Sequence, residues 1–188
     1  FLSSTFHDSV SNDPEDSYEV AGIVQVGMRR MHKEMETVYY YMTTMNENYK
    51  QPEMPKGVEQ DIISGMYLLE DGNLKGFKVA KPINKNARLR LLGSGTILRE
   101  VLKAATILRA EYSVAVDVWS VTSFNELRKE ALAISRENML NPSKKPKIPF
   151  ITEKLSARRG QVVAATEDMK DNSDQVREFV PDTYKVLG

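Results

Sequence analysis

The feature that most constrains the fold of this chain is a regular alternation of apolar runs and amphipathic segments in residues 88–188. Four runs rich in branched aliphatic residues predict buried strands, at 89–92, 114–121, 161–166 and 184–187. Helices are expected between them, at 96–112, 123–138 and 173–180. Because strands that alternate with helices pair in parallel, the sequence predicts an α/β fold. We expect a mostly parallel sheet with helices on both faces.

The composition excludes several classes of protein. A chain of 188 residues with 41% hydrophobic and 28% charged residues is typical of a globular protein with a core of its own. Cysteine is absent and histidine occurs twice, which excludes disulfides, thiol nucleophiles and a histidine-rich metal site. No apolar run approaches the ~20 residues that span a bilayer, and the start does not resemble a signal peptide. The sequence therefore predicts a soluble, cytoplasmic protein without a membrane partner.

Charge divides the chain into two regions. Residues 1–72 carry 13 acidic and five basic residues, a net charge of −8, whereas residues 73–188 carry a net charge of +8. Such a shift often marks a domain boundary. We expect a first domain at 1–72, a basic linker at 73–87 and a second domain at 88–188. Because the chain starts with Phe and stops on Gly188 directly after a strand-like run, the second domain is expected to be truncated.

The first region predicts half of a parallel α/β unit. Asp13 is the expected N-cap of a helix that runs to about Met31. The run at 37–44, which contains three consecutive tyrosines, predicts a strand covered on both faces. A short helix is expected after Gly57, extending to Met66.

One candidate site is the turn Gly93-Ser94-Gly95, between an expected strand and an expected helix. Backbone N–H groups and the helix dipole at such a turn can hold a phosphate or a carboxylate. The turn lacks the third glycine of a dinucleotide fingerprint and the lysine of a P-loop. The alternative is therefore a tight turn in which Ser94 or Thr96 caps the helix.

A second candidate is the polar block Asn46-Glu47-Asn48, directly after the tyrosine-rich strand. These side chains would contact a ligand or a partner protein, or close a turn through Asx-type hydrogen bonds. The sequence leaves the two interpretations open.

Other chemistry-bearing residues are weaker candidates. Ser120, Thr122 and Ser123 lie at the carboxyl end of a buried strand and would line a cleft there, with Ser123 also forming a capping box with Glu126. A serine nucleophile needs a histidine, and both histidines lie in the other region, so a catalytic triad is not expected. Lysines at 144–147 lack the interleaved aromatic residues of a nucleic-acid site. No nucleic-acid partner is expected.

Several blocks of the sequence closely resemble the homodimeric-type pyruvate dehydrogenase decarboxylase component. They are VYYYMTTMNENY at 38–49, LLGSGTILR at 91–99, DVWSVTSFNEL at 117–127 and the end of the chain, YKVLG. The matches occur in order and cover nearly the whole chain. The poorest matches are at 73–87 and 152–161.

The resemblance implies a thiamine-diphosphate enzyme that decarboxylates pyruvate and transfers the acetyl group to a lipoyl group. It implies that 1–72 is the end of the middle, pyrimidine-binding domain and that 88–188 is a transketolase-like C-terminal domain. The family's motifs for diphosphate, metal and cofactor activation are not in this stretch. No catalytic, cofactor-binding or metal-ligating residue is therefore expected in this chain. Thiamine diphosphate and Mg²⁺ would belong to the full-length parent.

Two functional hypotheses follow. In the first, the chain is a structural and dimerisation segment of a homodimeric decarboxylase component, which docks on a dihydrolipoyl acetyltransferase core and is inactive alone. In the second, it is a non-catalytic α/β module that binds a protein partner or a small anion, with Gly93, Ser94 and Gly95 or Asn46, Glu47 and Asn48 as contacts.

Overall fold

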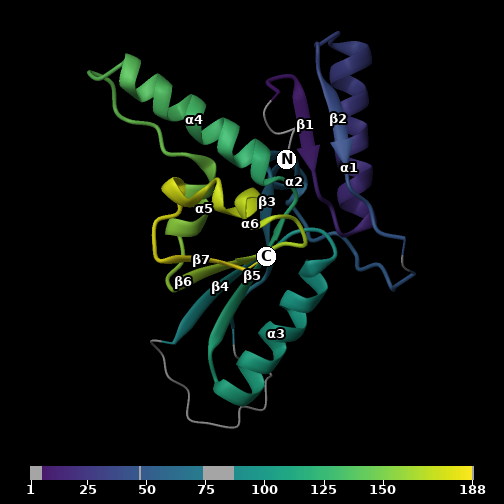
Figure 1. The fold of residues 1–188 in the computed structure, drawn as a ribbon, viewed down its shortest axis with the longest axis vertical. Helices are drawn as coiled ribbons and strands as arrows, with labels where there is room; N and C mark the ends of the chain where they lie inside the picture. Colours follow the sequence, from purple (N-terminus) through teal and green to yellow (C-terminus); the bar gives the residue numbers. More distant parts are fainter. Residues whose placement is uncertain (1–5, 47, 74–86, 188) are drawn as a thin grey trace.

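The computed structural model describes residues 6–46, 48–73 and 87–187 and places them in two parallel or mostly parallel sheets (Figure 1). A small sheet pairs β1 with β2, and a larger sheet has the strand order β3-β5-β4-β6-β7. The strands are β1 (Ser9–Asn12), β2 (Tyr39–Met42), β3 (Met66–Glu70), β4 (Arg88–Gly93), β5 (Ala115–Val121), β6 (Gln161–Ala165) and β7 (Tyr184–Leu187). The helices are α1 (Ser17–Met28), α2 (Glu59–Ser64), α3 (Ile97–Tyr112), α4 (Phe124–Leu140), α5 (Phe150–Ser156) and α6 (Lys170–Asp174).

The larger sheet is covered on both faces, as the sequence predicts. Successive residues of β4 point to opposite sides, so that Leu91 packs in a cluster with Leu98 and Val101 of α3. Leu92 packs on the other face with Leu127 of α4 and Leu155 of α5. Strands β4 to β7 pair in parallel and only β3 is antiparallel. The α/β prediction, with a mostly parallel sheet, is confirmed.

The first region forms the expected parallel unit, but β2 is not buried on both sides. β1 and β2 pair in parallel with α1 between them in the chain. Tyr39 and Tyr41 are about half exposed, whereas Tyr40 packs against Gly27 of α1. Only one face of this two-stranded sheet is covered by α1, so alternate residues of the tyrosine run face solvent. The prediction of a doubly covered strand is wrong.

Two helix ends differ from the sequence predictions. Helix α1 begins at Ser17 with Asp16 as N-cap, in a capping box with Glu19, and a π-helical turn (Arg29–Lys33) follows its last residue. The predicted N-cap, Asp13, instead lies at the end of β1, where its backbone N–H donates to Thr122 of β5's following turn. Helix α2 ends at Gly65, whose φ of +111° suits glycine, so Met66 belongs to β3 rather than to the helix.

Strand β3 lies before the expected domain boundary at 72, yet it belongs to the larger sheet. It pairs with β5 and lies at one edge of the sheet. Of the expected basic linker at 73–87, residues 74–86 lie outside the described residues. Toward the other edge, the single helix expected at 173–180 is replaced by α6 and a separate 3₁₀ turn (Arg177–Phe179).

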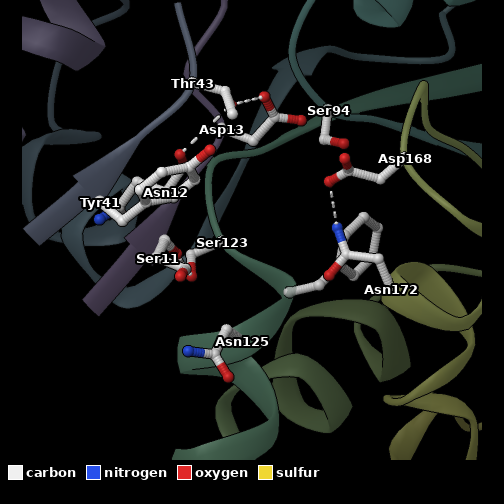
Figure 2. A pocket seen from close by; sticks show the side chains of 11 residues that line it. Ser11, Asn12, Asp13, Tyr41, Thr43, Ser94, Ser123, Asn125, Asp168 and Asn172 are labelled. Atoms are coloured by element: carbon white, nitrogen blue, oxygen red, sulfur yellow. Dashed lines mark hydrogen bonds between the residues drawn. The ribbon is translucent and has the colours of Figure 1, made fainter. Parts of the chain in front are cut away.

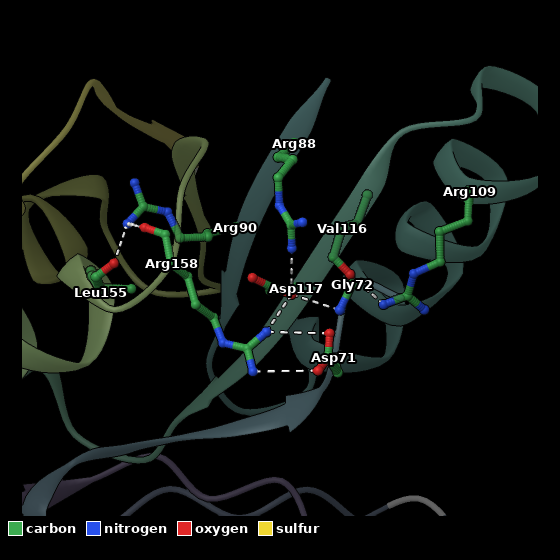
Figure 3. Close-up of polar contacts among 9 residues, drawn as sticks. All are labelled: Asp71, Gly72, Arg88, Arg90, Arg109, Val116, Asp117, Leu155 and Arg158. Carbon is green, nitrogen blue, oxygen red and sulfur yellow. Dashed lines mark hydrogen bonds and ion pairs between the residues drawn. The ribbon is translucent and has the colours of Figure 1, made fainter. Parts of the chain in front are cut away.

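Buried ionic contacts hold the amino end of the larger sheet together (Figure 3). The Asp117 carboxylate, 1% exposed, accepts hydrogen bonds from the Gly72 backbone N–H at 2.6 Å and from Arg158 at 2.9 Å. The fully buried Arg90 guanidinium donates to the carbonyls of Leu155 at 2.6 Å and Arg158 at 3.2 Å, and it also pairs with the Asp182 carboxylate. These side chains connect the strands to α5 and to the segment before β7.

Arg109 of α3 is buried, although helical spacing places it on the solvent-facing side of the helix. The residue is 3% exposed. Its guanidinium pairs with the Glu70 carboxylate and donates to the Val116 carbonyl. The ion pair with the edge strand draws the side chain out of the solvent-facing position that helical periodicity predicts.

Candidate functional site

A small polar cleft lies at the carboxyl ends of the central strands (Figure 2). The connections that leave β4 and β6 run to strands on opposite sides, β5 and β7, so the gap between the two strand ends is a topological switch point. Open parallel sheets bind ligands at such a point. Here the Ser94 hydroxyl after β4 donates to that of Thr166 after β6 at 3.2 Å. The start of α4 and the ends of β1 and β2 complete the wall.

Backbone contacts bring the small sheet to this position. The Asp13 backbone N–H donates to the Thr122 carbonyl at 2.8 Å, and its carbonyl accepts from the Gly95 N–H at 3.0 Å. The Ser123 hydroxyl, which also caps α4, donates to the Ser11 carbonyl. These bonds join residues more than 80 positions apart and fix β1 across the ends of β4 and β5.

Negative charge collects at one end of the cleft. Figure 2 shows the carboxylates of Asp13 and Asp168 on either side of Ser94. Burial raises the pKa of the Asp13 carboxyl despite contacts with Thr43 and Ser94, and the charges of Asp168 and Glu167 act in the same direction. The Asp13 Oδ2 atom is buried without a hydrogen-bond partner. Among the described residues that line the cleft there is no lysine, arginine or histidine.

Unpartnered amide groups lie along the rest of the cleft. Asn125, in the first turn of α4, is 3% exposed, yet neither its Oδ1 nor its Nδ2 atom has a hydrogen-bond partner. Asn12, at the end of β1, is 5% exposed and its Nδ2 atom is also unpartnered. Buried polar groups are nearly always hydrogen-bonded in native proteins. The side-chain amides of Asn125 and Asn12 are therefore expected to bond to a molecule that enters the cleft.

The structure places the two predicted candidate sites apart. Of Gly93, Ser94 and Gly95, Ser94 lines the acidic end of the cleft, and the Gly95 N–H already donates to the Asp13 carbonyl. The carboxylates of Asp13 and Asp168 beside this turn oppose the binding of an anion there. Thr96 is the N-cap residue of α3, as the alternative predicts, but its side chain makes no capping hydrogen bond.

The polar block after β2 does not reach the cleft. Asn46 and Asn48 are exposed beyond the end of β2 and do not line it. Glu47 lies outside the described residues. The two asparagines are therefore available for contact with another molecule.

Sequence reasoning missed three residues that define the cleft: Asp13, Asn125 and Asp168. Asn125 follows Ser123 in the run after β5, which the strand-end rule had already singled out as a cleft wall. Asp168 follows β6 in the same way. The signal was therefore present for these two, whereas Asp13 was assigned to a helix cap.

A second buried carboxylate, Glu19 of α1, joins the small sheet to the large one. It is fully buried and accepts hydrogen bonds from the Tyr67 hydroxyl at 2.6 Å and the Ser120 hydroxyl at 2.7 Å. The backbone N–H groups of Glu15 and Asp16 also donate to it. Burial raises its pKa, and the four donors act in the opposite direction. All of this bonding capacity is used within the chain, which indicates a structural role.

The cleft does not fit thiamine diphosphate. Its volume of about 110 Å³ is well below the roughly 300–1,000 Å³ of pockets for larger ligands. Its carboxylates would repel a diphosphate. The described residues also contain no group of three His, Cys, Asp or Glu residues that could hold a metal ion, and His7 and His32 are both exposed. None of the helices in the described part of the chain is long and apolar enough to cross a membrane.

Comparison with known protein families shows to which family the chain belongs. Residues 65–188 match the family model described as the transketolase-like TK C-terminal domain, and residues 1–52 match the pyruvate dehydrogenase E1 component middle domain. The chain belongs to the transketolase-like C-terminal domain family. The expected resemblance to the decarboxylase component is thereby confirmed.

Curated relatives extend this match to the whole chain. The pyruvate dehydrogenase E1 component of Pseudomonas aeruginosa is 48% identical over 188 residues, which is 100% of this chain and 20% of the relative. The components of Cupriavidus necator and Escherichia coli are each 45% identical over 99% of this chain and 20% of their own length. The chain thus spans about a fifth of the relatives it matches.

Proposed function

We propose that the chain is a structural segment of a pyruvate dehydrogenase E1 component, the enzyme that decarboxylates pyruvate and acetylates lipoyl groups. The observation that carries the proposal is the end-to-end match to E1 components at 45–48% identity, with two family models in the same order. Thiamine diphosphate and Mg²⁺ would bind to other parts of the complete enzyme, which we place in the cytoplasm. The acidic lining of the cleft supports a role without cofactor binding.

The same proposal assigns the domains and the partners. Residues 1–72 would complete the middle domain and residues 88–188 would form the C-terminal domain, with 73–87 as the connection. An apolar groove between α1 and α2, about 320 Å³ in volume and lined by Tyr18, Val26 and Ile63, supports contact with a second subunit. Val24 and Met28 of α1 are also exposed. We assign a homodimer and the dihydrolipoyl acetyltransferase core as partners, and no nucleic acid.

A chimeric enzyme tests this assignment. The corresponding fifth of the Pseudomonas aeruginosa E1 component is replaced by residues 1–188 of this chain, and pyruvate-dependent reduction of a dye acceptor is measured with thiamine diphosphate and Mg²⁺. The chimera is expected to be a dimer that retains activity within roughly tenfold of the parent, since the reacting groups lie outside the exchanged part. The isolated chain is expected to show neither turnover nor tight binding of the cofactor by calorimetry.

Two results would contradict the proposal. One is a dimeric chimera, folded by circular dichroism, that is inactive at saturating cofactor. The other is release of CO₂ from pyruvate by the isolated 188-residue chain. The matched control is the parent enzyme in which the same segment is exchanged for that of the Escherichia coli component, 45% identical to this chain.

A further inference from the structure

The charge and the hydrogen-bonding capacity of the switch-point cleft point to the kind of ligand it takes. Two carboxylates, Asp13 and Asp168, line one end, and no cation among the described lining residues compensates them. A ligand at this end therefore needs a positive charge. The Asp168 carboxylate is already oriented by the Asn172 amide, which donates to it at 2.7 Å. Both carboxylates are thus held in place before any ligand arrives.

Asn125 adds a second requirement at the other end. Its buried amide leaves both a donor, Nδ2, and an acceptor, Oδ1, without a partner. A bare metal ion would satisfy the acceptor and leave the donor unpaired. A hydroxyl or carbonyl group on the ligand can accept from Nδ2, and a hydroxyl can also donate to Oδ1. The ligand therefore carries a hydrogen-bonding group in addition to its charge.

The size of the cleft limits the ligand further. A volume of about 110 Å³ admits a molecule of a few heavy atoms and excludes a nucleotide or a coenzyme. Figure 2 shows Asp13 and Asp168 at one end and Asn125 at the other, on the side of α4. Charge and hydrogen-bonding group must accordingly be carried by one short molecule.

We propose that this cleft binds a small primary amine in its protonated form, with the ammonium group against Asp13 and Asp168 and a hydroxyl or carbonyl group against Asn125. No step of the proposed pyruvate chemistry uses this site. Its occupancy would tie the end of β1 to α4 and to the loop after β6, and so tighten the contact between the two sheets.

Calorimetry with 2-aminoethanol tests the proposal, at constant ionic strength set with sodium chloride. Binding is expected to saturate at one amine per chain. Ethylamine, which lacks the hydroxyl, is expected to bind about fivefold more weakly, because one neutral hydrogen bond is lost. Ethylene glycol, which lacks the charge, and potassium chloride are expected to produce no saturable heat.

Two variants and a control locate the site. Asp168→Asn removes a cleft charge and is expected to weaken binding about tenfold or more, and Asn125→Ala to abolish the preference for 2-aminoethanol over ethylamine. Asp171→Asn, an exposed acidic residue of α6 that does not line the cleft, is expected to leave binding unchanged. Before calorimetry, each variant is tested for a cooperative thermal unfolding transition. If the isolated chain shows no such transition, the same substitutions are made in the E1 chimera and binding is measured there.

The proposal is overturned by an absence of saturable heat, by equal binding of potassium, or by binding that neither substitution changes. Because the readout is heat rather than turnover, a negative result here does not bear on the assignment to the E1 component.

Discussion

The two ends of the large sheet differ in how far their buried polar side chains are bonded within the chain. At the amino end, Asp117 and Arg90 are buried and each bonds to several partners within the chain, although Asp117 Oδ2 and Arg90 Nε have none. At the carboxyl end, Asn125 is buried and neither polar atom of its side chain has a partner, whereas the half-buried Asp13 retains one oxygen without a partner. A buried charge without a partner lowers stability, whereas a paired one fixes the positions of the segments it joins. The comparison suggests that the amino end holds the fold together and that the carboxyl end is kept for a ligand.

The largest expected effect comes from breaking the amino-end network. Arg90→Met leaves the carbonyls of Leu155 and Arg158 without their donor and should lower the free energy of unfolding by about 3–5 kcal/mol. Urea unfolding followed by circular dichroism measures it. Arg159→Met, one residue after Arg158 but exposed, serves as control and should change stability by less than about 0.5 kcal/mol. If the two substitutions lowered the free energy of unfolding equally, the buried contacts of Arg90 would contribute no more to stability than an exposed arginine does.

A substitution at the turn beside the cleft should cost less. Gly95 has a φ of +52°, and a Cβ there would lie 2.6 Å from the Asp13 carboxylate. Gly95→Val should therefore lower the free energy of unfolding by about 2–3 kcal/mol through backbone strain and displacement of Asp13.

The control for this substitution is Gly22→Ala in α1, where a Cβ would meet no atom within 4 Å. This change should raise stability by about 0.5–1 kcal/mol, because alanine favours the helix. A Gly95→Val protein as stable as the parent would show that Asp13 does not pack closely against the turn at Gly95.

A third prediction concerns Glu15, a buried carboxyl between β1 and α1. Burial, with the adjacent charge of Asp16, raises its pKa to about 7. Because the folded protein then holds a proton that the unfolded chain releases near pH 4.5, this group costs stability as the pH rises from about 4.5 to 7. Glu15→Gln should therefore stabilise the chain at pH 8 by about 1–2 kcal/mol and leave its stability unchanged at pH 4.

The measurement is the free energy of unfolding from urea titrations at pH 4, 6 and 8. The exposed Glu53, which lies in the same region, is the control, and Glu53→Gln should change stability by less than about 0.5 kcal/mol at every pH. A benefit of Glu15→Gln that does not grow with pH would contradict the raised pKa.

The smallest expected effect on stability comes from Asp168→Asn. Asp168 is exposed, and its charge raises the pKa of Asp13. Removing that charge should change the free energy of unfolding at pH 7 by less than about 0.5 kcal/mol, in the stabilising direction. Thermal unfolding at low and high salt checks it, and a gain that persists at 1 M salt would point to a cause other than charge repulsion.

Much of the large sheet could be predicted from the sequence. Strands β4, β5, β6 and β7 lie within a residue or two of the predicted runs, because each run is rich in apolar and β-branched residues. The N-cap of α4 was also correct, since the Ser123 side chain accepts from the Glu126 N–H. Local chemistry determines both features.

The missed elements depend on contacts between distant segments. β1 has the sequence SVSN, which contains a single apolar residue, and it is a strand because it pairs with β2 some 30 residues later. β3 is likewise an edge strand defined by its pairing with β5. Helix α5 follows a proline-rich loop and has only seven residues, too few for a periodic pattern to be recognised.

The cleft could be predicted only in part, for the same reason. The strand-end rule located Ser123 and the turn at Ser94, but the opposite wall comes from β1, more than 100 residues from Ser123. Asp13 was assigned to a helix cap because the local sequence, an acid followed by proline, has that pattern. Its position over Gly95 is a property of how the two sheets dock.

Glu19 has a consequence for how such proteins can be divided. It belongs to the stretch that matches one family model, 1–52, yet two of its donors, Tyr67 and Ser120, belong to the other, 65–188. A cut placed in the interval between the two models would strand an acid on one piece and two hydroxyls on the other. The boundaries of the family models therefore need not be the boundaries of the units that fold cooperatively. We expect the two matched segments to fold stably only when they are produced as one chain.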